Sequence, residues 1–190
     1  MKIVIGIPAR LGSSRLPGKP LAKIAEMPMI EHVYKRCSLS KHGDHTFIAT
    51  CDEEIKHVVE SFGGNAIMTD PDISRPGLRV AEAAKTLNLE DNDIVVAVQG
   101  DEPFVHPNMI ELAIEPLIKE KDIFVSNMVS KINNDDEWED SNNVKVVTDL
   151  NRNAIYMSRS PIPSTNHEEL RGERLLQVCI MPFYWHFMKK

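Results

Sequence analysis

The chain opens with Ile3-Val4-Ile5-Gly6-Ile7-Pro8-Ala9-Arg10-Leu11-Gly12-Ser13-Ser14-Arg15-Leu16-Pro17-Gly18-Lys19-Pro20-Leu21. An apolar run, which we expect to form a buried strand over residues 2–7, stops at a proline and leads into a loop with three cations among glycines and serines. Glycine lets the backbone approach an anion closely, and arginine and lysine supply the compensating charge. The stretch therefore predicts a strand followed by a polyphosphate-binding loop. The alternative is a solvated basic loop after an edge strand.

The loop matches neither of two common phosphate-binding motifs. A Walker A loop has Ser or Thr after its Gly-Lys pair, whereas Pro20 follows Lys19 here, and the Gly-x-Gly-x-x-Gly fingerprint of dinucleotide-binding proteins is absent. An anion site would therefore depend on the cations Arg10, Arg15 and Lys19 and on the backbone between them.

Apolar, strand-like runs alternate with amphipathic helical stretches over the first two thirds of the chain. This alternation predicts an α/β fold with a doubly wound, mostly parallel sheet and right-handed crossovers. The expected strands cover residues 2–7, 46–50, 65–68, 93–98 and 123–129, and the expected helices begin at Pro28, after an Asp52 N-cap, near Val80 and at Pro107.

The pattern changes after about residue 130. We treat residues 1–190 as one domain, in which residues 1–130 form the core. The remainder, 131–190, is expected to hold an exposed acidic loop (133–143), a β-hairpin (144–148 and 154–157), an irregular stretch (158–165) and an apolar run that returns to the sheet (175–183).

A second loop with chemical potential, Gln99-Gly100-Asp101-Glu102-Pro103, follows the strongest predicted strand. Ligands of open α/β sheets bind beyond the carboxyl ends of the strands, so this loop and the opening loop should converge at one edge. Because Mg²⁺ takes one or two carboxylates together with phosphate oxygens and water, Asp101 opposite a basic loop indicates a Mg²⁺ site. A plain Gly-Asp turn is the alternative.

Composition excludes several classes of protein. The chain has 190 residues, a net charge of −6 and three cysteines, Cys37, Cys51 and Cys179, that are isolated in the sequence. The acidic balance argues against nucleic-acid binding, and the cysteine spacing suggests reduced core thiols rather than a zinc site or disulfides. We see no signal peptide and no segment of transmembrane length, so we predict a cytoplasmic protein without membrane partners.

The motif Pro-Ala-Arg-x-Gly-Ser-Ser-Arg-Leu-Pro-Gly-Lys-Pro-Leu at residues 8–21 resembles the signature of the cytidylyltransferases that activate acidic sugars. The enzymes for 3-deoxy-manno-octulosonate (KDO) are most similar, and the CMP-sialic acid synthetases are more distant. Three later segments extend the resemblance: Gln-Gly-Asp-Glu-Pro at 99–103, Asn-Val-Lys-Val-Val at 143–147 and Ala-Ile-Tyr-Met-Ser-Arg-Ser-Pro-Ile-Pro at 154–163.

The resemblance implies a nucleotidyltransferase-like, Rossmann-type fold and a reaction. CMP would pass from CTP to KDO or a KDO-like sugar with release of pyrophosphate, supported by Mg²⁺, in surface polysaccharide or lipopolysaccharide synthesis. It also implies roles for individual residues. The catalytic residues would be Arg15, Lys19 and Asp101, and Asp101 would also be the metal ligand. The nucleotide would be bound by Pro8, Ala9, Arg10, Leu11, Gly12, Ser13, Ser14, Lys19 and Gln99. The sugar would be bound by Arg79, Arg159 and Gln177.

The chain departs from the family pattern in two places. The family's His-x-Ser-Gly-Thr-x-Arg motif reads Ile-Ser-Arg-Pro-Gly-Leu-Arg at residues 73–79, so only Arg79 at its end is kept. The family's His-x-Gly-x-Tyr segment reads Gln-Val-Cys-Ile-Met at 177–181. Two alternatives therefore stay open: the sugar differs from KDO, or the sugar site is weakened.

The family's dimer-forming helical region and second Mg²⁺ aspartate have no counterpart here, so a homodimer is expected only if that region exists. A fragment, a truncated product and a degenerate paralogue all stay open. Two other functions also stay open: a nucleotide-sugar glycosyltransferase, although such enzymes usually carry Asp-x-Asp, and a non-catalytic nucleotide-binding protein.

Overall fold

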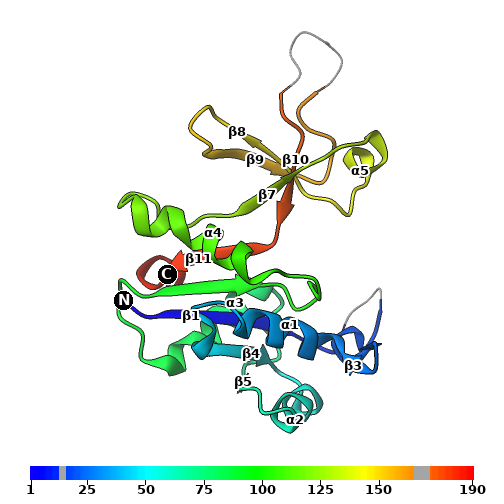
Figure 1. Ribbon diagram of the computed structural model, residues 1–190, viewed down its shortest axis with the longest axis vertical. Helices are drawn as coiled ribbons and strands as arrows, with labels where there is room; N and C mark the ends of the chain where they lie inside the picture. Colours follow the sequence, from blue (N-terminus) through cyan, green and yellow to red (C-terminus); the bar gives the residue numbers. More distant parts are fainter. Residues whose placement is uncertain (13–15, 165–171) are drawn as a thin grey trace. The chain divides into compact units, whose positions relative to one another are not determined.

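A computed structural model describes residues 1–12, 16–164 and 172–190 (Figure 1). The chain forms two compact units, one of Met1–Ser126 with Ile180–Lys190 and the other of Asn127–Cys179. Each unit is built around its own sheet. Among the described residues, no helix is long and apolar enough to cross a membrane.

The first unit has a five-stranded sheet in the order β11-β6-β1-β4-β5. All neighbouring strands are parallel except β11, which runs antiparallel to β6. Its strands are β1 (Ile3–Ala9), β4 (Thr46–Thr50), β5 (Ala66–Met68), β6 (Ile94–Val98) and β11 (Ile180–Tyr184), beside a small β2 (Lys23–Ile24) and β3 (Met27–Pro28) ribbon. The predicted mostly parallel α/β sheet is thus confirmed.

Helices pack on both faces of this sheet. A Cβ on Gly6 of β1 would lie 2.4 Å from Val80, which places α3 against that face. The neighbouring residue Ile7 points to the opposite face, on the side of Ile30 in α1, because successive side chains of a strand alternate. The helices are α1 (Met29–Ser38), α2 (Glu53–Ser61), α3 (Pro76–Ala84), α4 (Pro107–Lys119) and α6 (Trp185–Met188), with short 3₁₀ turns η1 (Lys19–Leu21), η2 (Gly43–His45) and η3 (Lys85–Leu87).

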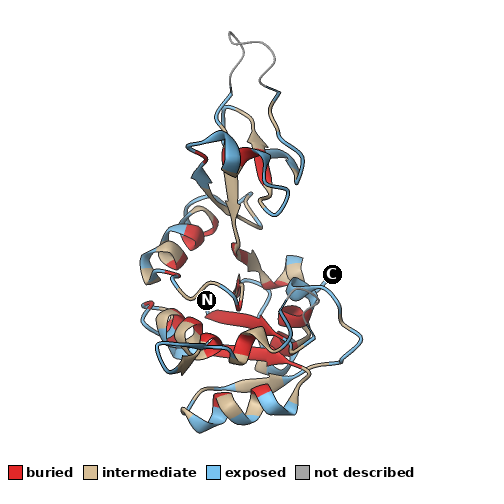
Figure 2. Cartoon of the chain, turned by 90° about the vertical axis from the view of Figure 1, so that its right-hand side faces the viewer, coloured by how far each residue is buried: buried red, intermediate tan, exposed pale blue. Residues whose placement is uncertain are grey.

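The core of the first unit lies between the sheet and these helices. Figure 2 shows its central strands as buried, and every residue of β1 and β4 is buried. Apolar runs buried on both faces are typical of central parallel strands, which is why these strands could be recognised in the sequence. One buried cluster consists of Val4, Phe47, Ala49, Val80, Ala83, Ala84, Val95 and Trp185.

The second unit has an antiparallel sheet in the order β7-β10-β8-β9. Its elements are β7 (Met128–Lys131), α5 (Asp135–Glu139), β8 (Lys145–Thr148), β9 (Ala154–Ser158) and β10 (Leu175–Val178). The predicted hairpin corresponds to β8 and β9 and is confirmed.

Three predictions for the latter part of the chain are wrong in detail. No continuous strand covers residues 123–129, since Val125 makes only an isolated bridge to Phe183 and the strand begins at Met128. The segment 133–143 is not simply an exposed loop, because it contains α5 with a buried Trp138. The run 175–183 divides between two sheets: β10 joins the sheet of the second unit, and only β11 returns to the first.

Candidate active site

Two loops meet at the carboxyl edge of the first sheet. Strands β1 and β6 are parallel neighbours, and the opening loop follows β1 as the Gln99–Pro103 loop follows β6. The backbones touch: a Cβ on Gly100 would lie 2.6 Å from the carbonyl oxygen of Pro8. Only glycine permits this approach, so the convergence predicted from the sequence is present in the fold.

An ion pair joins the two loops. The Nζ of Lys19 lies 2.6 Å from Oδ2 of Asp101, and the two side chains are 36% and 45% exposed. Gly18, with a left-handed φ of +70°, turns the chain into η1, which begins with Lys19. Because both groups are open to water, the pair has only a modest energy and can open to a ligand. Lys19 could then bind an anion while Asp101 binds a cation.

The carboxylates of this edge suit a hard cation. Glu102 follows Asp101 directly, and burial together with the negative charge of Asp101 raises its pKa, while Lys19 opposes that rise. Among the described residues no group of three or more His, Cys, Asp or Glu side chains gathers for a metal. One or two carboxylates suffice for Mg²⁺ when phosphate oxygens and water complete its shell, so the residues present fit that ion.

The remaining nucleotide-site predictions lie along the same edge. Pro8 and Ala9 are buried at the end of strand β1, whereas Arg10 and Gly12 are exposed just beyond it. The Arg10 side chain makes no hydrogen bond or ion pair with any residue that the structure describes. Gln99 is half-buried, and its carbonyl accepts the N–H of Glu102. Ser13, Ser14 and Arg15 lie outside the described residues.

Arg79, predicted to bind sugar, is buried in the first unit with a relative exposure of 2%. Its guanidinium donates to the Thr69 hydroxyl and to the carbonyls of Asp70 and Ile73. These bonds fix the turn between β5 and α3. Arg79 therefore has a structural role in this turn, and its role as a sugar ligand stays a prediction.

Arg159 and Gln177 belong to the second unit. Nη1 of Arg159 donates to the carbonyls of Ser141 at 3.0 Å and Asn142 at 2.9 Å, and within the described part of the chain its Nε and Nη2 have no partner. One edge of the exposed Arg159 guanidinium is therefore bonded to backbone carbonyls, and the other edge can donate hydrogen bonds to a carboxylate. The amide of Gln177 donates to Oδ1 of Asn127 at 3.0 Å.

Sequence reasoning missed Lys145, the only lysine among the buried polar residues described. Its Nζ donates to three backbone carbonyls, those of Asp140 at 2.7 Å, Asn143 at 3.0 Å and Arg159 at 2.7 Å. Lys145 thus fixes the backbone of Arg159. It also holds the loop of residues 140–143, to which the Arg159 side chain donates its own hydrogen bonds. Its position in the Val-Lys-Val-Val motif was a signal, but a lysine in a strand gives no hint of such burial.

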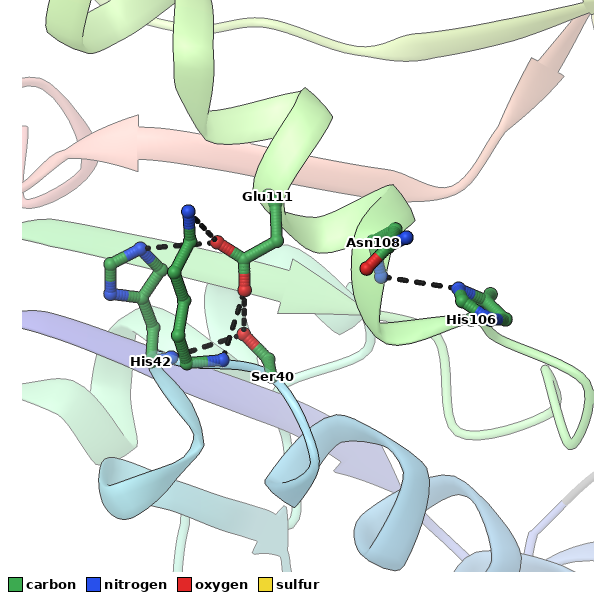
Figure 3. A network of polar contacts seen from close by, with 6 residues as sticks. Ser40, His42, His106, Asn108 and Glu111 are labelled. Carbon is green, nitrogen blue, oxygen red and sulfur yellow. Dashed lines mark hydrogen bonds and ion pairs between the residues drawn. The ribbon is translucent and has the colours of Figure 1, made fainter.

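A polar cluster anchors α4, the helix that follows the Asp101 loop (Figure 3). Oε1 of Glu111 accepts from the Ser40 hydroxyl at 2.7 Å and from the Lys41 N–H at 3.0 Å. Its Oε2 lies 3.0 Å from Nζ of Lys41, which pairs with it by charge, and 3.5 Å from Nε2 of His42. Burial and the charge of Lys41 lower the pKa of His42, which favours its neutral form. At the start of the helix, the His106 ring accepts the N–H of Asn108. These contacts tie α4 to the turn after α1.

Comparison with known proteins agrees with this geometry. The family described as Cytidylyltransferase matches residues 3–188. The 8-amino-3,8-dideoxy-manno-octulosonate cytidylyltransferase of Shewanella sp. (strain W3-18-1) is 46% identical over 164 residues, which cover 86% of this chain and 67% of that protein. The 3-deoxy-manno-octulosonate cytidylyltransferase 2 of Hydrogenovibrio crunogenus is 46% identical over 167 residues, with the same coverage of both chains.

A solved structure is similar over the whole chain. The CMP:2-keto-3-deoxy-manno-octonic acid synthetase complexed with CTP superposes with a TM-score of 0.90 at 35% identity, covering 100% of this chain and 76% of that one. The fold of this chain thus recurs in a protein whose structure was solved in complex with CTP. On the family match over residues 3–188 and these relatives, the chain belongs to the cytidylyltransferase family.

Proposed function

We propose that the chain transfers CMP from CTP to an acidic keto sugar of the 3-deoxy-manno-octulosonate type. The Lys19–Asp101 pair at the meeting point of the two loops carries the proposal, since it sets an anion-binding cation beside a cation-binding carboxylate. Relatives that act on the 8-hydroxy and the 8-amino sugar are equally similar, at 46% identity, so the proposal names the class that the two sugars share.

The nucleotide would lie along the carboxyl edge of the first sheet. Lys19 and Arg15 hold the β- and γ-phosphates, and Arg10 with the backbone from Leu11 to Ser14 lines the pocket for the rest of the nucleotide. The side-chain amide of Gln99 lies near the nucleotide. The exposure of Arg10 just beyond the end of β1 supports this arrangement, because an exposed cation at that edge can bind an anion.

Asp101 would hold Mg²⁺, which when bound supplies neutralisation of the triphosphate charge. The unused edge of the Arg159 guanidinium would bind the sugar carboxylate, with Gln177 of the same unit as a further sugar-site residue. The buried Arg79 would contribute through the turn that it fixes between β5 and α3. The hydroxyl on the anomeric carbon then attacks the α-phosphorus, the bond from that phosphorus to the bridging oxygen breaks, and pyrophosphate leaves. Positioning and charge compensation by the protein suffice, and no covalent intermediate is needed.

The product would supply surface polysaccharide synthesis, including lipopolysaccharide. A cytoplasmic location belongs to the same proposal, as do a homodimer if the full family domain is present and the absence of nucleic-acid and membrane partners.

Pyrophosphate release tests the proposal directly. The purified chain is given CTP, Mg²⁺ and either 3-deoxy-manno-octulosonate or its 8-amino analogue, and release is followed with each sugar. Lys19→Ala should lower kcat/KM for CTP about 100-fold, because one charged donor to the developing phosphate charge is lost. The matched control is Lys85→Ala, which removes an exposed lysine paired with Glu82 at 2.7 Å and should leave turnover unchanged.

Each other function has its own signature in the same experiment. Tight CTP binding without pyrophosphate release from any sugar would indicate a non-catalytic nucleotide-binding protein. Release of a nucleoside diphosphate from a nucleotide sugar would indicate a glycosyltransferase. Equal turnover of wild type and Lys19→Ala would overturn the role of the opening loop.

A further inference from the structure

Asp52 stands at the carboxyl edge of the sheet, between β4 and α2. Its residue type and position predict a helix N-cap, yet its side chain makes no capping hydrogen bond. Instead Oδ2 accepts the backbone N–H of Leu11 at 2.8 Å. The carboxylate is therefore directed away from its own helix and toward the start of the opening loop.

The strand register explains why these two residues meet. In the parallel pair of β1 and β4, Ala9 lies opposite Thr50. Leu11 and Asp52 each lie the same distance beyond these partners, so they are neighbours where the pairing ends. A side-chain oxygen of Asp52 satisfies an N–H that the sheet no longer pairs, which lets the chain leave the sheet at this point.

Leu11 is fixed on its other side as well. Its carbonyl oxygen accepts the N–H of Gly18 at 3.1 Å, which closes the loop at its base. Gly18 immediately precedes Lys19, and Lys19 pairs with Asp101. A continuous series of contacts thus runs from the Asp52 carboxylate through Leu11 and Gly18 to the cation of the site.

Asp52 is itself held firmly. Its N–H donates to the hydroxyl of Thr50 at 3.1 Å, and the carbonyl of the buried Thr50 accepts both the N–H and the hydroxyl of Thr69. The Thr69 hydroxyl accepts from Arg79, which is buried in α3. The anchor for the opening loop is therefore connected to the core and does not depend on an isolated surface side chain.

We propose that Asp52 is a positioning residue for nucleotide binding: its carboxylate oxygen fixes Leu11 and thereby sets the base of the loop that presents Lys19. The proposal rests on the proposed function, since that function is what makes Lys19 a phosphate ligand. Asp52 touches no reacting atom in this scheme. Asp52 acts through the position of its carboxylate oxygen, which accepts the Leu11 N–H, and not through the negative charge of the carboxylate.

Three substitutions separate position from charge. Asp52→Ala removes the acceptor, Asp52→Asn keeps an acceptor oxygen in place without charge, and Asp52→Glu keeps the charge but moves the oxygen by one methylene. The control is Asp149→Ala, because the Asp149 carboxylate also accepts backbone N–H groups at 2.8 Å, from Asn151 and Asn153 in the β8–β9 turn.

The first measurement is hydrogen exchange of the Leu11 amide by NMR, and the second is CTP affinity by calorimetry in the presence of Mg²⁺. Loss of the acceptor for the Leu11 N–H should speed Leu11 exchange at least about tenfold in Asp52→Ala and weaken CTP binding about 10- to 100-fold. Asp52→Glu should behave like Asp52→Ala. Asp52→Asn should stay within about threefold of wild type in both measurements, and Asp149→Ala should match wild type. KM for the sugar should not change in any variant.

Unchanged Leu11 exchange in Asp52→Ala would overturn the proposal, and so would faster exchange with unchanged CTP affinity. Equal losses in Asp52→Asn and Asp52→Ala would show that charge, not position, matters. If the wild type itself bound no CTP, the proposed function would fail, and the Leu11 exchange rates would still decide whether Asp52 sets the loop.

Discussion

Replacing Lys145 with methionine tests how the second unit is held together. The Lys145 side chain is fully buried, and its ammonium donates three hydrogen bonds to backbone carbonyls and, among the residues that the structure describes, none to a carboxylate. Methionine fills most of the same volume but leaves the three carbonyls without this donor. Three charge-assisted bonds contribute about 5–9 kcal/mol, and the desolvation that a buried ammonium suffers offsets several kcal/mol of this. The net loss should be about 3 kcal/mol.

Urea unfolding followed by tryptophan fluorescence measures this loss. The chain has two tryptophans, and Trp138 lies in the second unit, so a Trp185→Phe background makes the signal specific for that unit. A loss of about 3 kcal/mol should lower the midpoint by about 1–2 M urea.

The matched control is Lys131→Met in the same background. Lys131 lies in the same unit, but its side chain is 71% exposed and pairs with Glu173 at 3.0 Å. Its loss should change the stability by no more than about 0.5 kcal/mol. Equal midpoints for the two variants would refute the reasoning, because the buried ammonium would then contribute no more than an exposed one.

The first sheet could be predicted from the sequence because its information is local. An apolar run such as Asp93–Val98 has no polar alternation, and its length excludes a helix of normal size. Once strands and helices alternate, each helix returns the chain to the start of a parallel strand, so the carboxyl ends of all the parallel strands lie at one edge. The meeting of the Lys19 and Asp101 loops followed from that rule alone, although the residues are 82 positions apart.

The second unit was harder to predict because its order depends on contacts between distant residues. Helix α5 is short and acidic, and its local start signal, the Asn134 cap that accepts the N–H of Glu137, is weak because Asn residues are equally common in loops. It is held by tertiary contacts: the guanidinium of Arg174 lies 4.3 Å from the centre of the Trp138 ring and pairs with Asp135 at 2.6 Å, and the Trp138 indole donates to the carbonyl of Ile162. Such pairings are not visible in a pattern of neighbouring residues.

The functional residues show the same division. Asp52 was predicted to be a helix cap from its residue type and position, and Arg79 was predicted to be a sugar ligand from its place in the family motif. In the structure, both side chains bond to backbone groups instead. Asp52 accepts the N–H of Leu11, which is distant in the sequence, and Arg79 donates to the carbonyls of Asp70 and Ile73. The sequence around each residue does not reveal these partners. A polar side chain at a sheet edge can serve the ligand or the fold with the same atoms, so residue type alone leaves the choice open.

Two further predictions follow from close packing. Burial raises the pKa of the Cys37 thiol to about 12, so iodoacetamide at pH 8 should leave Cys37 unmodified in the native protein, whereas mass spectrometry of the urea-unfolded chain should show all three cysteines modified. Gly100→Ala should lower the melting temperature by about 5 °C, because its Cβ would lie 2.6 Å from the Pro8 carbonyl oxygen, a backbone atom that can move only with β1. Gly77→Ala is the control: its Cβ meets no atom within 4 Å and alanine favours the helix α3, so the melting temperature should not fall. An unaltered Gly100→Ala protein would mean that the two loops of the site are not packed against each other, which would remove the structural basis for pairing Lys19 with Asp101.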